Sequence, residues 1–199
     1  MSAVCIIPAR GGSRRIPRKN IRDFKGQPML AYAIQCALKS GIFDYIFVST
    51  DDEEIASIAR ACGAETHYRS PAMAEDSVGT QAVMKSVLED LINAGIVFDV
   101  ACCLYPCVPL LEPSDLVSAK KIMEEAQAAY VFSVGTNPLH DAGQFYIGWT
   151  DAFLDHEPLI SSNSIMYPIP KERDIDINTE NDWKEAERKF DALRGEYVH

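Results

Sequence analysis

The stretch from Arg10 to Lys25 concentrates positive charge and predicts a site for a small polyanion. It holds seven basic residues against one acid, Asp23, so its net charge is +6. Because the whole chain carries −10, the remainder carries −16. A nucleic-acid binder needs a broad basic face, which this acidic chain does not offer. The alternative is a solvated, highly charged loop. The basic residues are Arg10, Arg14, Arg15, Arg18, Lys19, Arg22 and Lys25.

The residues inside this stretch are of types that hold phosphate. Gly11 and Gly12 lack a Cβ, so the backbone can turn sharply and direct its N–H groups at an anion. Ser13 adds a hydroxyl donor, while Arg14 and Lys19 add charges that suit phosphate oxygens. The run GGSRRIPRK has neither the Walker spacing nor the GxGxxG pattern, which disfavours a nicotinamide-cofactor site. The sequence therefore favours a phosphate-binding loop of another type.

Length and composition predict a single domain that is soluble and cytoplasmic. The 199 residues are 47% hydrophobic and 24% charged, which is enough for one sizeable core. No apolar run reaches the ~18 residues of a membrane span. The N-terminal MSAVCIIPARGG contains no separate apolar region typical of a signal peptide. Six cysteines without a CxxC pair or a histidine cluster indicate reduced thiols and no zinc site.

Strands and helices are predicted to alternate along the chain. The expected strands cover 3–7, 45–49, 65–68, 100–104, 130–134, 144–147 and 165–169. The expected helices cover 28–40, 50–62, 80–93, 114–123 with Ser114 as its cap, and 181–193. This alternation is typical of a largely parallel sheet with helices on both faces. Ligands of such sheets bind beyond the carboxyl ends of the strands, where the basic loop leaves the first strand.

Several motifs together resemble a known enzyme family. IPARGGSRRIPRKN, VSTDDEEIA, RSPAMAEDSVGT and DINTENDWKEAE are similar to the CMP-sialic acid synthetase group, the cytidylyltransferases that activate nine-carbon acidic sugars. HDAGQFYIG most resembles the branch that acts on pseudaminic acid. The resemblance implies a three-layer α/β/α, Rossmann-like nucleotidyltransferase fold with a mostly parallel, mixed sheet. It also implies CTP and a nonulosonic acid as substrates, Mg²⁺ as cofactor, and a homodimer.

The resemblance also implies which residues bind the nucleotide. The first loop would wrap the triphosphate, with Lys19 and Arg14 also catalytic, and Arg69 would lie near the nucleotide. Asp76 and Thr80 match a loop that contacts ribose and base; the alternative for both is the start of the following helix. The triphosphate residues are Arg10, Gly11, Gly12, Ser13, Arg14, Lys19 and Asn20.

A second implied set would bind the sugar and the metal. Asp176, which is also assigned a catalytic role, and Asn178 match a carboxylate pair that binds Mg²⁺ in the family. An amide oxygen can ligate a hard cation but brings no charge, so weaker metal binding is expected here. Cys107, in YPCVP, is interpreted as a buried thiol. The sugar-site residues are Tyr105, His140, Asp141, Gly143 and Gln144.

The chain departs from the family between 135 and 140. Relatives have a longer segment there, whereas this chain has only GTNPL. Either the segment is short, or residues near Pro138–Leu139 are absent from this sequence, and we favour absence because a lid is mobile. Two functional alternatives stay open at this point. One is transfer onto sialic acid, legionaminic acid or Kdo; the other is a nucleotide-binding homologue that has lost catalysis.

Overall fold

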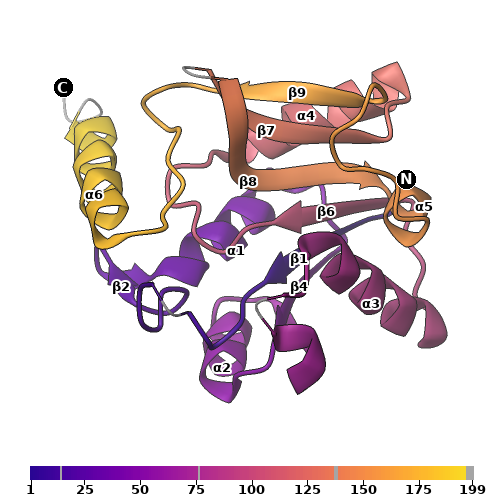
Figure 1. Ribbon diagram of the computed structural model, residues 1–199, viewed down its shortest axis with the longest axis horizontal. Helices are drawn as coiled ribbons and strands as arrows, with labels where there is room; N and C mark the ends of the chain where they lie inside the picture. The colour runs from indigo at the N-terminus through magenta and orange to yellow at the C-terminus, as the bar shows by residue number, and fades with distance from the viewer. Residues whose placement is uncertain (14, 76, 137–138, 196–199) are drawn as a thin grey trace.

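A seven-stranded sheet crosses the described part of the molecule (Figure 1). The computed structural model describes residues 1–199 except Arg14, Asp76, 137–138 and 196–199. The strands are β1 Ala3–Pro8, β2 Asp23–Phe24, β3 Gln27–Pro28, β4 Tyr45–Thr50, β5 Glu65–Tyr68, β6 Val100–Leu104, β7 Tyr130–Thr136, β8 Leu139–Trp149 and β9 Ser164–Ile169. The helices are α1 Met29–Ser40, α2 Glu53–Ala61, η1 Pro71–Ala74, α3 Thr80–Asn93, α4 Pro113–Ala126, α5 Thr150–Leu154 and α6 Glu180–Gly195.

The sheet is mixed and mostly parallel, as predicted. Its strand order is β5-β4-β1-β6-β8-β7-β9, and among these strands β8 runs antiparallel to both of its neighbours. From β1 the chain moves to β4 and β5 on one side and then crosses to β6 on the other. Strand order therefore reverses between β1 and β6, which is where ligands bind in open α/β sheets.

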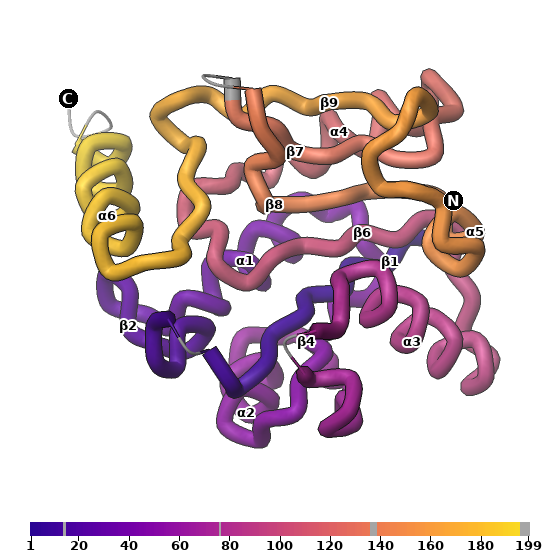
Figure 2. The backbone as a smooth tube through the Cα atoms, viewed as in Figure 1, coloured from indigo at the N-terminus to yellow at the C-terminus, as the bar shows by residue number. Residues whose placement is uncertain are grey.

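The buried strands explain why helices cover both faces of the sheet (Figure 2). Ala3–Pro8 is apolar at successive positions rather than alternating, as expected for a strand buried on both sides. Cys5 and Ile7 pack in one cluster with α1, α2 and α4, whereas Val4 and Ile6 pack in another with α3 and α5. The predicted three-layer α/β/α arrangement is confirmed.

Some elements differ from the sequence-based expectation. Helix α4 is capped by Glu112 rather than Ser114, because Pro113 takes the first helical position. Glu112 and Asp115 exchange hydrogen bonds with each other's backbone in a capping box. The short pair β2–β3 and helix α5 were not predicted. All six cysteines are free thiols.

Helix α6 closes the end of the molecule that faces the basic stretch. Phe24 of β2 makes edge-to-face contacts with Trp183 and Phe190 of α6, with ring centroids 5.4 and 5.5 Å apart. The Arg22 guanidinium lies 4.5 Å from the centre of the Trp183 ring. Aromatic pairs of this geometry add to the apolar area that they bury. Helix α6 therefore holds the C-terminal part of the basic stretch, around Arg22 and Phe24.

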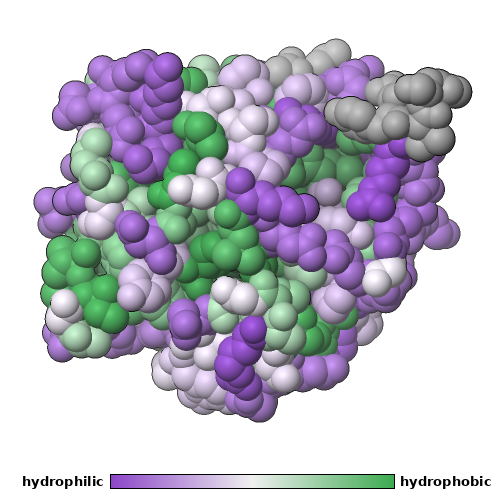
Figure 3. All heavy atoms as spheres, turned by 180° about the vertical axis from the view of Figure 1, so that it is seen from behind, coloured by the Kyte–Doolittle hydropathy of each residue, from purple (hydrophilic) through white to green (hydrophobic). Residues whose placement is uncertain are grey.

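The surface seen from behind carries both hydrophilic and hydrophobic areas, with hydrophobic residues gathered near the centre of the view and at its left edge (Figure 3). The exposed large apolar side chains lie on several elements, among them Leu38 of α1, Val117 of α4 and Met166 of β9. Across the described ranges, we find no helix whose length and apolar character would let it cross a bilayer.

Candidate active site

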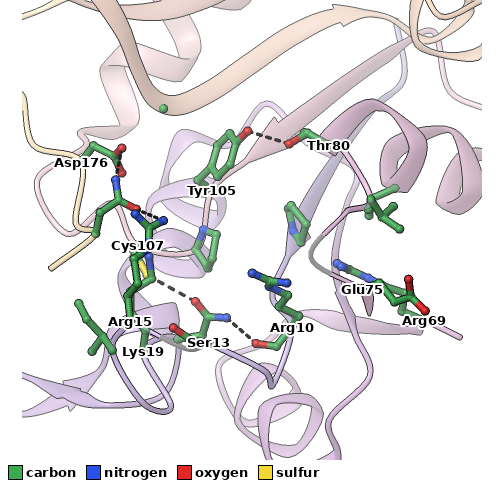
Figure 4. Close-up of a pocket in the computed structure, with 18 residues that line it drawn as sticks. Arg10, Ser13, Arg15, Lys19, Arg69, Glu75, Thr80, Tyr105, Cys107 and Asp176 are labelled. Carbon is green, nitrogen blue, oxygen red and sulfur yellow. Dashed lines mark hydrogen bonds between the residues drawn. The ribbon is translucent and has the colours of Figure 1, made fainter. Parts of the chain in front are cut away.

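A cavity of about 510 Å³ opens at the carboxyl ends of β1, β5 and β6 (Figure 4). It lies where strand order reverses, and residues from the 10–20 loop, the 170–178 segment and the start of α3 complete its wall. Its lining combines cationic, acidic and aromatic side chains. The lining residues are Pro8, Arg10, Ser13, Arg15, Ile16, Lys19, Asn20, Arg69, Glu75, Val78, Thr80, Val83, Tyr105, Pro106, Cys107, Gly143, Asp176 and Asn178.

Most of the residues assigned from the sequence meet at this cavity. Those that line it are Arg10, Ser13, Lys19, Asn20, Arg69, Thr80, Tyr105, Gly143, Asp176 and Asn178. Those that do not are Gly11, Gly12, His140, Asp141 and Gln144. Arg14 and Asp76 lie outside the described residues, as does Pro138.

The loop after β1 is held in shape by the two acids that follow β4. The Gly11 N–H donates to Asp51 Oδ1 at 2.9 Å. Arg18, with a φ of +55°, forms ion pairs with Asp52 and, at 2.5 Å, with Glu54. The hydrogen bond from Arg18 lowers the pKa of Asp52 despite the partial burial of that carboxylate. Arg18 is therefore engaged in shaping the loop.

Asn20 fastens the loop from inside. Its Nδ2 donates to the Arg10 carbonyl at 2.9 Å, and its Oδ1 accepts from the Cys107 thiol at 3.4 Å. Both ends of this buried amide are thus used within the protein. Cys107, expected to be buried, is only partly buried on the cavity wall, and desolvation raises the pKa of its thiol to about 11. A protonated thiol is a poor nucleophile, in line with the passive role expected for this residue.

Positive charge reaches the cavity from opposite sides. Arg15 and Lys19 lie below Asp176, Arg69 lies across the cavity beside Glu75, and Arg10 stands between them (Figure 4). Arg69 is only 6% exposed, and its guanidinium donates to Ser49 O at 2.8 Å and Ser49 Oγ at 3.3 Å. Burial lowers the pKa of Arg69; Asp51 opposes this and Arg10 adds to it. The charge of Arg69 is therefore strongly desolvated, and an anion bound in the cavity would compensate it.

Tyr105 links two walls of the cavity. It follows β6, and its hydroxyl is 2.8 Å from Thr80 Oγ1 at the start of α3. Burial raises the pKa of Tyr105, so the phenol stays neutral and can donate or accept a hydrogen bond. Thr80 thus both begins a helix and faces the cavity, so the two interpretations of this residue are compatible.

The acidic side of the cavity is a connected set of polar groups. Asn178 Nδ2 donates to Asp176 Oδ2 at 2.5 Å, and Arg15 Nη2 donates to Asn178 Oδ1 at 2.8 Å. Lys19 Nζ donates to the Ile177 carbonyl at 2.7 Å. These contacts bring the phosphate-type loop and the 176–178 segment together although they are over 150 residues apart in the sequence.

The donor set tests whether a divalent cation fits here. Groups of three or more His, Cys, Asp or Glu suited to a metal do not occur within the described residues. Asp176 supplies one carboxylate, and Asn178 an amide oxygen that also accepts from Arg15. Mg²⁺ is commonly bound by one or two carboxylates together with substrate phosphates and water. The residues fit a cation that binds with a phosphorylated substrate rather than a preformed all-protein cage.

The residues expected at the sugar site divide into two groups. Gly143, with a φ of +58°, faces the Asp176 carboxylate. Asp141 accepts hydrogen bonds from the Gly143 N–H and from the Tyr146 hydroxyl, so it shapes the turn before the rest of β8. His140 lies 3.6 Å from the Asp174 carboxylate. His140 therefore contacts the 170–178 segment, whereas Asp141 contacts residues of its own strand, β8.

A family model described as Cytidylyltransferase matches residues 4–146 of this sequence. That span contains the loop after β1, Arg69, Thr80, Tyr105 and Gly143. The chain belongs to the cytidylyltransferase family. The resemblance read from the motifs is confirmed, and this cytidylyltransferase is a nucleotidyltransferase enzyme.

Curated relatives carry related names. The chain is 34% identical to a "Pseudaminic acid cytidylyltransferase" of Campylobacter jejuni subsp. jejuni serotype O:23/36 (strain 81-176), over 92% of this chain and 93% of the relative. It is 28% identical to "N-acylneuraminate cytidylyltransferase A" of Danio rerio, over 92% of this chain and 50% of that one. The first alignment spans 216 positions, more than the 199 residues here, so the relative has residues without a counterpart.

Solved structures agree with the fold. A CMP:2-keto-3-deoxy-manno-octonic acid synthetase complexed with CTP superimposes with a TM-score of 0.73 at 15% identity, covering 100% of both chains. A cytidylyltransferase from Leptospira borgpetersenii superimposes with a TM-score of 0.70 at 17% identity, covering 94% of this chain and 85% of that one. At such identities these likenesses establish the shared fold alone.

The cytidylyltransferase holds its 170–178 segment with Arg173 and Asp115, which the sequence did not single out, and with Gln144, which was expected at the sugar site. Arg173 reaches the N-terminus of α4 and forms a bidentate ion pair with Asp115, which also accepts from Tyr167. Gln144 Nε2 donates to the Arg173 carbonyl at 3.1 Å, while the buried Gln144 Oε1 finds no hydrogen-bond partner among the described residues. Asp115 and Arg173 are separated by 58 positions, so no local pattern predicts their pairing.

Two further cavity residues, Arg15 and Glu75, could have been predicted from the sequence. Arg15 belongs to the basic stretch that the charge pattern identified, yet it received no individual role. Glu75 directly precedes Asp76 in the motif RSPAMAEDSVGT. Each of these residues could have been predicted because it stands next to a residue assigned to the site, and not because of its own residue type.

Proposed function

We propose that this cytidylyltransferase transfers CMP from CTP to pseudaminic acid and releases pyrophosphate. The anomeric hydroxyl of the sugar would attack the α-phosphorus and pass its proton to solvent water. The bond from that phosphorus to the bridging oxygen would break as pyrophosphate leaves. The Campylobacter relative's name and the HDAGQFYIG motif support this acceptor. Sialic acid, legionaminic acid and Kdo are the alternatives.

One observation supports this chemistry most directly: cationic side chains from separate elements face one cavity together with Asp176. Arg10, Arg15, Lys19 and Arg69 would bind phosphate oxygens. Arg15 and Lys19, which lie on the Asp176 side of the cavity, would neutralise the charge that develops on the departing pyrophosphate. The loop residues Gly11, Gly12 and Ser13 would offer backbone N–H groups and a hydroxyl, and Thr80 and Tyr105 would contact the nucleoside or the sugar. Catalysis then consists of positioning and charge stabilisation, without a covalent enzyme intermediate.

Mg²⁺ is part of the proposal. Asp176 and Asn178 would hold it together with the substrate phosphates, and when bound it would act as a Lewis acid on those oxygens. Lys19 bonds the Ile177 carbonyl between these two residues, so the lysine and the candidate ligands keep a fixed separation. The homodimer, and a longer segment near 135–140, remain predictions. β7 and β8 pair up to Thr136 and Leu139, with only positions 137 and 138 between them.

The test is pyrophosphate release from CTP, Mg²⁺ and each candidate sugar acid in parallel. We expect pseudaminic acid to give the highest kcat/KM, and a higher value for another sugar would replace the acceptor. Lys19→Ala should lower kcat about 10²- to 10³-fold while the Kd for CTP changes far less. Lys25→Ala is the matched control, because Lys25 belongs to the same stretch but pairs with Asp191 of α6 at 2.7 Å. Equal turnover of the Lys19→Ala variant and the wild type would refute the role of Lys19.

A further inference from the structure

A chain of hydrogen bonds runs from the cavity to the outer surface of α3. Arg69 Nε donates to Ser49 Oγ at 3.3 Å, and Ser49 Oγ lies 3.2 Å from His67 Nδ1. His67 Nε2 lies 2.9 Å from Asp90 Oδ2. Ser49 and His67 are register partners on the adjacent strands β4 and β5. The two strands therefore set these side chains against each other directly.

The chain has one self-consistent direction. The Asp90 carboxylate only accepts, so a neutral His67 in this contact carries its proton on Nε2 and offers Nδ1 as an acceptor. Ser49 then donates its hydroxyl proton to Nδ1, which leaves its oxygen lone pairs for the Arg69 N–H. Ser49 and His67 therefore each donate once toward the surface and accept once from the cavity side, while Arg69 only donates and Asp90 only accepts. In the neutral tautomer of His67 no member of the chain lacks a partner.

Serine, histidine and aspartate in contact could also indicate a hydrolase, but the geometry excludes that reading. Ser49 is completely buried and is absent from the cavity lining, so no substrate carbonyl can approach its Oγ. That oxygen already accepts from Arg69. The serine is therefore a fixed bridge between an imidazole and a guanidinium.

The hydrogen-bonded chain matters most for the orientation of the Arg69 guanidinium. Arg69 is 6% exposed, and its guanidinium donates to Ser49 twice, to the backbone oxygen and to Oγ. The backbone contact alone would allow rotation about the Cζ–Nη2 direction, whereas the second contact fixes the plane of the guanidinium. Since Arg69 lines the cavity, the plane decides which of its remaining N–H groups a bound anion can use.

We infer that Ser49 and His67 are positioning residues: through a hydrogen-bonded chain anchored on Asp90, they orient Arg69 for the nucleotide. The inference rests on the proposed nucleotide site. In this inference β4, β5 and α3 do more than pack together. They carry the side chains that link the surface carboxylate of Asp90 to the buried cation of Arg69 and so fix its orientation. The effect should concern binding of CTP more than the rate of the chemical step, because Arg69 lies across the cavity from Asp176 and Lys19.

The test compares CTP binding and turnover in four variants. We expect Ser49→Ala and His67→Leu to raise the Kd for CTP roughly five- to ten-fold while kcat at saturation stays within about two-fold. His67→Asn should restore most of the affinity, because its Oδ1 stands near the position of Nδ1 and still accepts from Ser49. Thr66→Ala is the matched control, since Thr66 is the next residue on β5 and its hydroxyl contacts Arg60 instead.

A spectroscopic measurement separates this inference from the proposed function. In the free protein, ¹⁵N NMR should show His67 as the Nε2–H tautomer, and Ser49→Ala and His67→Leu should both shift the Arg69 Nε–H signal. If the wild type fails to bind CTP, the proposed function is wrong, but the Arg69 signal still decides the orientation. An unmoved Arg69 signal, or unchanged CTP affinity in both variants while Arg69→Met binds weakly, would overturn the inference. So would unchanged affinity in Arg69→Met itself.

Discussion

The carboxylate of Asp52 occupies the space where a side chain on Gly11 would begin. Asp52 Oδ2 lies 2.6 Å from the position of a Cβ on Gly11, and Asp52 Cβ lies 3.0 Å from it. Asp52 cannot easily move away, because it caps α2 through the Ile55 N–H and pairs with Arg18. The close approach of the loop to the start of α2 therefore requires a glycine at position 11, whereas the space around Gly12 is open.

Gly11→Ala should consequently displace the loop and weaken CTP binding by about ten-fold, with a loss of about 1–3 kcal/mol in the free energy of unfolding. Calorimetric titration with CTP and urea unfolding would measure the two effects. Gly12→Ala serves as the control and should behave like the wild type in unfolding, because nothing lies within 4 Å of its added methyl group. Equal behaviour of the two variants would show that the close contact at Gly11 is relieved at no cost.

Removing one partner of the Asp115–Arg173 pair should lower the free energy of unfolding strongly. Asp115 and Arg173 side chains are 4% and 11% exposed, so Asp115→Asn removes the bidentate counter-charge of a buried guanidinium and leaves it only Glu112, at 3.9 Å. We expect the free energy of unfolding to fall by about 3 kcal/mol. Arg60→Met removes an exposed pair with Glu53 and should cost less than about 1 kcal/mol. Urea unfolding compares them, and similar losses would contradict a special role for the buried pair.

Asn178→Asp should strengthen metal binding. The substitution adds a second carboxylate beside Asp176 and still accepts a hydrogen bond from Arg15. We expect the Mg²⁺ concentration for half-maximal activity to fall by about five-fold or more, since carboxylate charge is a main determinant of affinity for hard cations. Titration of Mn²⁺ in the presence of CTP, followed by electron paramagnetic resonance, gives a readout independent of turnover. Asp176→Asn should shift both measurements in the opposite direction; if neither variant alters Mn²⁺ affinity, the proposed metal site is wrong.

The Asp52–Arg18 pair predicts a defined pH dependence of stability. The hydrogen bond from Arg18 holds the pKa of Asp52 below its ordinary value of 3.8 in the folded protein. A carboxyl group with a lowered folded pKa stabilises the protein above its unfolded pKa and loses that contribution as the pH falls through the folded pKa. Asp52→Asn keeps the helix cap but loses the ion pair, so it should cost about 1 kcal/mol at pH 7. In urea unfolding this difference should shrink as the pH falls below 3.8. A difference that stays constant down to pH 3 would contradict the assignment.

Particular residues show how far sequence reasoning reaches in this protein. Arg10, Ser13 and Lys19 were assigned to one site from a strand, a Gly-Gly turn and a cluster of charge, and they do line one cavity. Thr80 and Asp176 came from family motifs and also lie there. His140, Asp141 and Gln144 belong to the same kind of motif, yet none of them lines the cavity. His140 and Gln144 contact Asp174 and Arg173, and Asp141 contacts Gly143 of its own strand. A motif identifies residues that matter together but does not say toward which side of a strand each one points.

The sequence by itself determined the alternation of strands and helices, and with it the parallel sheet and the position of the basic loop at the carboxyl end of β1. These features follow from local periodicity and from chain direction, which are properties of short segments. The tertiary structure alone decided which residues meet across long separations. Asp52 approaches Gly11, Asp115 pairs with Arg173, and Ser49 bonds both Arg69 and His67. Such contacts depend on strand order and on the packing of whole elements, because two residues far apart in the chain meet only when every element between them is placed.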